Sequence, residues 1–181
     1  MLRPGFDDFA RLAAGADLVP VWREFLFDAD TAVTAYWKLA RAAREGEGGE
    51  GRAHFGFLLE SVVGGETWAR YTFLGTRPRE AWRLMAGGRV SRWTPQHGWS
   101  APESVTDPLA DLERLLLARR PAAAPGLPRF FGGAVGYIGY DVVRYLERLP
   151  AGPPDDLGLP EALFLFTDVV LAIDNLFGRA Y

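Results

Sequence analysis

The sequence contains no cysteine among its 181 residues. Without thiols the chain has no disulfide framework, no thiolate nucleophile and no cysteine ligand for zinc or an iron–sulfur cluster. The two histidines, His54 and His97, have no partner histidine at metal-ligand spacing, and no G-x-S-x-G elbow surrounds a serine. We therefore expect neither a metal centre nor a hydrolase triad in this chain, and a reducing cytoplasm as its compartment.

The sequence also lacks a long apolar run and a strong charge of either sign. The longest apolar stretch, residues 162–173, is interrupted by Thr167 and Asp168 and is predicted to be one buried strand. Acidic residues follow the N-terminus closely, where a secretory signal needs an apolar run. The net charge is −3 with both signs mixed, so we expect no nucleic-acid partner and no membrane partner.

The composition is nevertheless sufficient for a core, because 49% of the residues are hydrophobic and 13% are aromatic. This predicts a soluble, globular, single domain over residues 1–181. Residues 18–120 form its first part. A Pro/Ala linker over 121–128 leads into its second part, residues 128–181.

Helical periodicity occurs in three places. A short apolar face over residues 6–13 ends before Gly15, and Asp30 or Thr31 is expected to cap a second helix. That helix carries an apolar stripe of Val33, Tyr36, Trp37 and Ala40. A third helix is expected after an N-cap aspartate and an N1 proline at 107–108.

Strand patterns occur between these helices. Gly87 and Gly88 form a two-residue turn of the kind that tolerates positive φ, which predicts an antiparallel hairpin. The expected fold is α+β, mainly antiparallel sheets packed with a few helices, and part of a larger layered sandwich. The predicted strands are residues 55–60, 69–74, 81–86, 89–94 and 162–173.

Four glycines stand close together at positions 132, 133, 136 and 139. Their spacing fits neither G-x-G-x-x-G nor a phosphate-binding loop. The alternative is a strand whose glycines allow close approach of another backbone, followed by a helix over about 140–148 that packs Val143, Leu146 and Tyr137 inward.

The clearest indication of function lies at the end of the predicted strand 55–60. Glu60 and Ser61 place a carboxylate and a hydroxyl side by side, and these groups can bind an α-ammonium and a carboxylate while apolar neighbours hold an indole-sized body. The alternative interpretation is that both residues are simply the first solvated positions after a buried strand. Short motifs alone do not decide between the two.

Several ordered segments together resemble the N-terminal region of anthranilate synthase component I. The same region occurs, less similarly, in aminodeoxychorismate synthase component I. The resemblance runs from about residue 19 to 181 and rests on VPVWRE (19–24), FLLES (57–61), RYTFLG (70–75), RFFGGAVGY (129–137) with YDVVR (140–144), and DDLGLP (155–160).

The resemblance implies a function for the complete enzyme. Members of this family convert chorismate to anthranilate and pyruvate with Mg²⁺ and with ammonia from a glutamine amidotransferase partner, and L-tryptophan inhibits them. Their chemistry belongs to a C-terminal chorismate-binding domain that this chain does not reach. No catalytic residue is therefore carried over, and the chain alone is expected to be inactive, with any Mg²⁺ bound by the other domain.

The matching Leu-Leu-Glu-Ser motif implies that Ser61, Glu60, Leu59 and Arg70 belong to the tryptophan inhibition site. Two other functions stay open, a stand-alone amino-acid-binding or interaction module and the aminodeoxychorismate homologue. Turn chemistry at 174–178 followed by a return strand at 179–181 predicts a hairpin with an exposed final edge, as expected of a fragment of a longer enzyme.

Overall fold

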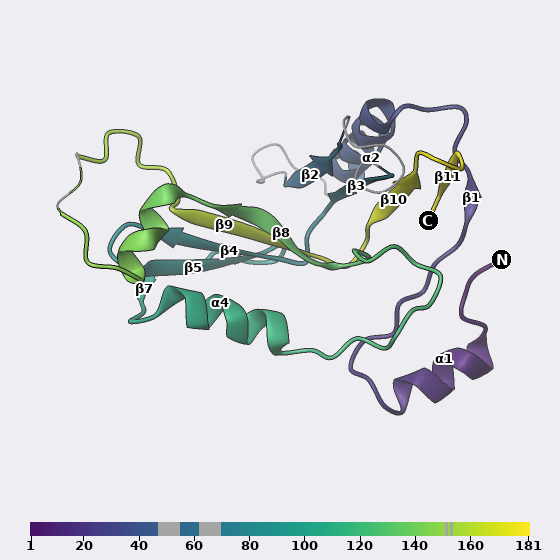
Figure 1. The fold of residues 1–181 in the computed structure, drawn as a ribbon, viewed down its shortest axis with the longest axis horizontal. Coiled ribbons are helices and arrows are strands. Elements are labelled where there is room, and N and C mark those ends of the chain that lie inside the picture. The colour runs from purple at the N-terminus through teal and green to yellow at the C-terminus, as the bar shows by residue number, and fades with distance from the viewer. Residues whose placement is uncertain (47–54, 62–69, 151, 153) are drawn as a thin grey trace.

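The computed structural model describes residues 1–46, 55–61, 70–150, 152 and 154–181. It contains two antiparallel sheets and a few helices, which confirms the predicted α+β class (Figure 1). The helices are α1 (Phe6–Ala13), α2 (Ala32–Gly46), α4 (Pro108–Leu117) and the 3-10 helix η1 (Tyr140–Tyr145).

The larger sheet has six strands. Its order is β6-β5-β4-β9-β8, with β7 also paired to β5. Helices α4 and η1 cover one face, where Trp82, Leu84, Leu112 and Phe166 form the main core. The strands are β4 (Glu80–Met85), β5 (Arg89–Thr94), β6 (Gly98–Trp99), β7 (Glu103–Ser104), β8 (Gly133–Ile138) and β9 (Ala162–Thr167).

Two local predictions are confirmed in this sheet. Gly87 and Gly88 lie in the turn that joins β4 to β5, with φ of 78° and 69°. The turn has three residues, 86–88, because Met85 pairs with Arg89, so the antiparallel hairpin is confirmed but its two-residue turn is not. The Asp107 side chain accepts a hydrogen bond from the backbone nitrogen of Ala110 at 2.9 Å, and Pro108 occupies the first helical position of α4.

The glycine-rich strand β8 approaches its neighbour closely, as predicted. A Cβ added to Gly136 would lie 1.9 Å from the carbonyl oxygen of Leu163 in β9. The segment that follows is a 3-10 helix, which is shorter than the predicted 140–148. It buries Val142 instead of Leu146, which is exposed together with Tyr137, so that part of the prediction is wrong.

The smaller sheet has five strands in the order β1-β11-β10-β3-β2. Helix α2 packs on one of its faces against Leu74 and Ile173. The strands are β1 (Phe25–Leu26), β2 (Gly56–Leu59), β3 (Tyr71–Thr76), β10 (Leu171–Asp174) and β11 (Arg179–Ala180).

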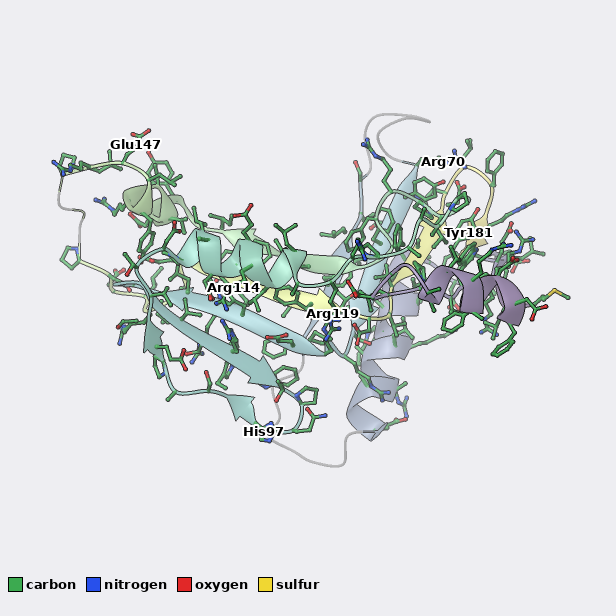
Figure 2. All side chains as sticks on the ribbon, turned by 90° about the horizontal axis from the view of Figure 1, so that it is seen from below. Arg70, His97, Arg114, Arg119, Glu147 and Tyr181 are labelled. Carbon is green, nitrogen blue, oxygen red and sulfur yellow. The ribbon has the colours of Figure 1, made fainter. Side chains whose placement is uncertain are left out.

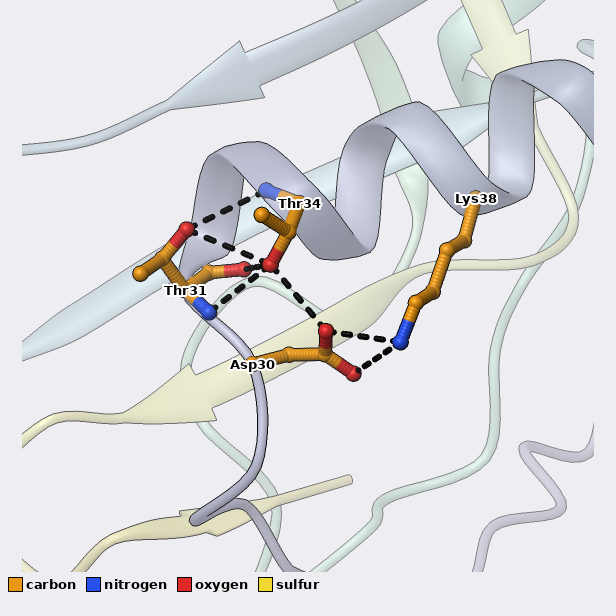
Figure 3. Close-up of polar contacts among 4 residues, drawn as sticks. All are labelled: Asp30, Thr31, Thr34 and Lys38. Atoms are coloured by element: carbon orange, nitrogen blue, oxygen red, sulfur yellow. Dashed lines mark hydrogen bonds and ion pairs between the residues drawn. The ribbon is translucent and has the colours of Figure 1, made fainter.

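Thr31 caps helix α2, because its hydroxyl oxygen accepts a hydrogen bond from the Thr34 backbone nitrogen at 3.2 Å. Asp30 instead binds Lys38 at 2.7 and 2.8 Å and accepts from the Thr34 hydroxyl (Figure 3). The predicted stripe is wrong for Val33 and Trp37, whose exposed fractions are 53% and 63%, and correct for Tyr36, which packs against the core of this sheet.

The buried face of α2 consists of small residues, Ala32, Ala35 and Ala43. Small side chains let the helix approach the sheet closely, and a Cβ at Gly56 would lie 2.5 Å from the Tyr36 hydroxyl oxygen. The apolar stripe includes Tyr36 but misses this alanine face, because the contact with the sheet is made mostly by small side chains.

The predicted strand over 162–173 is in fact two strands in different sheets. Strand β9 ends at Thr167 in the six-stranded sheet, and β10 begins at Leu171 in the five-stranded sheet. The change of sheet occurs where the apolar run is interrupted, and Asp168 forms an ion pair there with Arg79 at 2.9 Å.

The predicted hairpin after β10 is confirmed by the pairing of β10 with β11. Its final edge is not exposed, because Phe25 and Leu26 of β1 pair with Ala180 and Arg179. Sequence reasoning missed this pairing since β1 has two residues and lies more than 150 positions away. Among the described helices, none combines the length and apolarity that crossing a membrane requires.

Candidate functional site

The Leu-Leu-Glu-Ser motif lies at the end of an edge strand. Leu59 is the last residue of β2 and pairs with Phe73 of β3, and its exposed fraction is 47%. Glu60 and Ser61 follow directly and are both exposed. Within the described residues their side chains have no hydrogen-bond partner, so the carboxylate and the hydroxyl are accessible to a ligand.

Arg70 lies at the same end of the sheet, directly before β3. Its Nε atom is 3.1 Å from Asp174 Oδ1, and its Nη2 atom is 2.7 Å from Asp174 Oδ2. The guanidinium carbon lies 4.9 Å from the ring centroid of Tyr71 and 5.0 Å from that of Phe177. The arginine is therefore held by a bidentate ion pair and by two cation–π contacts.

The electrostatics of this pair follow from burial and contact. Burial raises the pKa of Asp174, but the hydrogen bond and charge of Arg70 outweigh burial, and the resulting pKa is below the ordinary value. The hydrogen bond to Asp174 raises the pKa of Arg70. Both groups are consequently charged at neutral pH, although the Asp174 side chain is 0% exposed.

Strand register places Leu59 of the motif and Asp174 of the ion pair on one face of the five-stranded sheet. Leu59 pairs with Phe73, and Tyr71 pairs with Asp174, so these side chains share the face opposite α2. Glu60 and Ser61 lie beyond the last residue of β2, so the alternation of the strand does not set which face their side chains take. Figure 2 shows Arg70 near Tyr181 at this end of the molecule, away from His97 and Glu147.

Aromatic rings cover part of this face. Tyr71 and Phe73 stack with centroids 5.9 Å apart, and Phe130 packs edge-on against Phe73 at 5.4 Å and against Phe57 at 6.4 Å. Phe130 comes from the segment before β8, so the glycine-rich region contributes a ring here. Together these rings form an apolar surface beside the polar groups.

These polar and aromatic groups are of the kinds that recognise a zwitterion with a flat apolar side chain. Glu60 can accept hydrogen bonds from an ammonium group, and Ser61 and Arg70 can donate to a carboxylate. Sequence reasoning proposed Glu60, Ser61 and Arg70 for this site but did not propose Tyr71, Phe73 or Asp174. Alternation of aromatic residues at 71 and 73 was a usable signal for the rings, whereas a partner 104 positions from Arg70 left no signal in the sequence.

Metal-binding side chains do not gather in the part of the chain that the structure describes, where no three His, Asp or Glu side chains could hold one ion together. Asp155 accepts hydrogen bonds from the backbone nitrogens of Leu157 and Gly158, at 3.2 and 2.9 Å, in an exposed turn. The adjacent Asp156 is also exposed.

No family model matches the chain, but proteins of known name do. It is 42% identical over 180 residues to anthranilate synthase component 1 of Pseudomonas putida, and 35% identical over 176 residues to that of Acetivibrio thermocellus. Both alignments cover 97% of this chain. A probable anthranilate synthase component 1 of Schizosaccharomyces pombe is 37% identical over 163 residues, or 90% of the chain. The chain spans about a third of the length of these relatives, 34%, 33% and 27% respectively.

Proposed function

This chain is homologous over nearly its whole length to anthranilate synthase component 1, and on that premise we propose that it is the N-terminal region of such an enzyme and carries part of its tryptophan inhibition site. The observation that supports the proposal is the position of Leu59, Glu60 and Ser61. Leu59 ends an edge strand and Glu60 and Ser61 follow it, at the end of the sheet where Arg70 precedes β3. The face that Leu59 shares with Phe73 carries stacked aromatic rings.

The energetics favour an aromatic amino acid as the ligand. An indole that buries roughly 150–250 Å² contributes about 4–6 kcal/mol at about 25 cal/mol per Å², before the costs of association. The polar groups then select the amino-acid end of the ligand. A flat ring against Phe73 and a zwitterion against Glu60 and Ser61 match tryptophan, the product that feedback inhibition would sense.

The rest of the enzyme lies outside this chain in the proposal. A chorismate-binding domain of the same polypeptide makes anthranilate, with Mg²⁺ and with ammonia from a glutamine amidotransferase. That domain also completes the tryptophan pocket, so residues 1–181 alone are inactive and bind tryptophan weakly. Inhibition requires two states of the full enzyme for which tryptophan has different affinities, and the packing between the two domains is the element expected to change.

The proposal is tested with Ser61→Arg in the full-length enzyme supplied with chorismate and ammonia. Anthranilate formation is followed by fluorescence over a series of tryptophan concentrations. The rate of each variant is divided by the rate of the same variant without tryptophan. A bulky guanidinium at Ser61 should abolish most of the inhibition. Ser104→Arg is the matched control, because Ser104 is also exposed but lies in β7 of the other sheet.

Unchanged inhibition in Ser61→Arg would contradict the assignment of the site. The reaction product identifies the enzyme independently. Formation of anthranilate supports the proposed activity. Formation of aminodeoxychorismate would instead assign the protein to the related folate-pathway enzyme. If chorismate is not converted, the remaining function is that of a binding module.

A further inference from the structure

The guanidinium of Arg70 offers only part of its hydrogen-bonding capacity to the protein. Nε and Nη2 face Asp174, whereas Nη1 has no hydrogen bond within the described residues. A guanidinium has five N–H donors in a fixed plane, so a carboxylate on the Nε and Nη2 edge determines where the Nη1 edge points. The Arg70 side chain is 32% exposed, which leaves that edge open to a ligand.

We propose that Asp174 is a positioning residue of the inhibitor site, which orients Arg70 so that its free edge receives the α-carboxylate of an aromatic amino acid. This inference rests on the proposed function. It adds the β10–β11 hairpin, which the Leu-Leu-Glu-Ser motif does not include, as a third segment of the site beside β2 and β3.

The hairpin is fixed to the start of β3 by several bonds. The Asn175 backbone nitrogen donates to the Arg70 carbonyl oxygen at 2.8 Å, and its side-chain nitrogen donates to the Thr72 hydroxyl at 3.1 Å. Asp174 Oδ1 also accepts from the Leu176 backbone nitrogen at 3.1 Å. Asp174 therefore cannot follow Arg70 if the arginine moves, and its carboxylate is a fixed reference for the guanidinium plane.

Phe177 in the same turn completes the arrangement. Its ring contacts the Arg70 guanidinium although 60% of the residue is exposed. An exposed phenylalanine gains little from burial, so its contact with Arg70 is the interaction that the turn provides. Tyr71 and Phe177 restrict rotation of the guanidinium out of its plane, and Asp174 restricts rotation within it.

A purely structural ion pair and a positioning pair differ in one measurable property. If Asp174 orients a carboxylate anchor, its loss weakens ligands that carry the α-carboxylate and spares those that lack it. If the pair only stabilises the fold, its loss weakens the binding of tryptophan and of tryptamine, which has no carboxylate, to the same extent.

The experiment measures dissociation constants of tryptophan and tryptamine for the full-length enzyme by calorimetry, with thermal unfolding as a check of folding. Asp174→Asn should raise the dissociation constant of tryptophan about 10-fold or more, which is the range for losing a hydrogen bond to a charged group. Tryptamine should change less than about 2-fold. Arg70→Lys should give the same pattern, and the double variant should be no weaker than Arg70→Lys alone, because both changes remove one function.

Asp168→Asn is the matched control, since Asp168 also pairs with an arginine, Arg79, but outside the site. It should leave both constants unchanged. Phe177→Ala removes a side chain that is 60% exposed, and it should weaken tryptophan binding severalfold while sparing tryptamine binding. This variant decides the question if Asp174→Asn does not fold.

Unchanged or tighter tryptophan binding in the folded Asp174→Asn variant, or equal weakening of both ligands, would overturn the inference. The Ser61→Arg experiment separates this failure from a failure of the proposed function. If Ser61→Arg abolishes inhibition and the hairpin variants bind tryptophan normally, only the role of Asp174 is wrong.

Discussion

The indole nitrogen of Trp82 donates a hydrogen bond to Oδ2 of Asp111 at 2.9 Å, inside the core between β4 and α4. Asp111 also receives the guanidinium of Arg92 at 2.9 Å and that of Arg114. One buried carboxylate thus connects the central part of the six-stranded sheet to the helix that covers it. The carboxylate is stable there because each of its oxygens has a charged or polar donor.

Replacing Trp82 by phenylalanine should destabilise the 181-residue chain by about 2–4 kcal/mol, because the variant loses a hydrogen bond to a charged group and leaves a small cavity. Urea unfolding measures the change. Trp37→Phe is the control, since Trp37 is exposed on α2 and should change the stability by less than about 0.5 kcal/mol. Similar losses in both variants would contradict the importance of the Trp82 bond.

The stability of the chain should decrease in acid. Burial raises the pKa of Asp111. The hydrogen bonds from Trp82, Arg114 and Arg92, together with the charge of Arg92, outweigh burial, so the pKa of Asp111 is below its ordinary value. The pKa of Asp174 is lowered as well. A lowered pKa in the folded state contributes stability above the unfolded value of about 3.9, and this contribution is lost as the pH falls through the folded pKa.

The contribution of Asp111 and Asp174 to the free energy of unfolding should therefore be constant above about pH 5. It should decrease steadily below about pH 4. Urea titrations across that range test this. Asp111→Asn, although less stable at neutral pH, should lose less stability on acidification than the parent chain. An equal loss in both proteins would mean that Asp111 does not carry the effect.

The hairpin glycines should differ in their tolerance of alanine. Both have positive φ, so Gly87→Ala should cost about 1–2 kcal/mol. Gly88→Ala should cost more, at least about 2 kcal/mol, because its Cβ would also lie 2.8 Å from the Val105 carbonyl oxygen. Thermal unfolding of the two variants checks the order, and equal melting temperatures would be evidence against this close contact.

The N-cap of α4 should contribute about 1 kcal/mol, measured as the stability lost in Asp107→Ala. Asp107→Asn keeps an oxygen that can accept from the Ala110 nitrogen and should retain most of the stability. A loss in the asparagine variant as large as in the alanine variant would show that charge, not the hydrogen bond, is what matters at this position.

The features predicted correctly from the sequence are those encoded by neighbouring residues. The hairpin at Gly87 and Gly88, the Asp107 cap and the return strand after β10 each depend on a few adjacent positions. The features that were missed depend on distant ones. The alanine face of α2 follows from the sheet it packs on, and the partner of Arg70 lies 104 positions away.

The candidate site divides in the same way. Glu60 and Ser61 could be proposed because polar residues follow an apolar strand, and that position at a strand end is what the structure has. Asp174 could not be proposed, because the run over 162–173 contains no mark of a second sheet beyond its polar interruption. Only the pairing of β10 with β3 brings its carboxylate to Arg70.

The three residues between β9 and β10 join an interior strand of one sheet directly to the middle strand of the other. Because strand residues alternate between faces, inserting or deleting one residue within β10 would turn Asp174 away from Arg70. A change of length within β9 would instead misplace Phe166 in the helix-covered core. Insertions and deletions within β9 or β10 should therefore be poorly tolerated, even though none of the residues assigned to the candidate site lies in the connector between them.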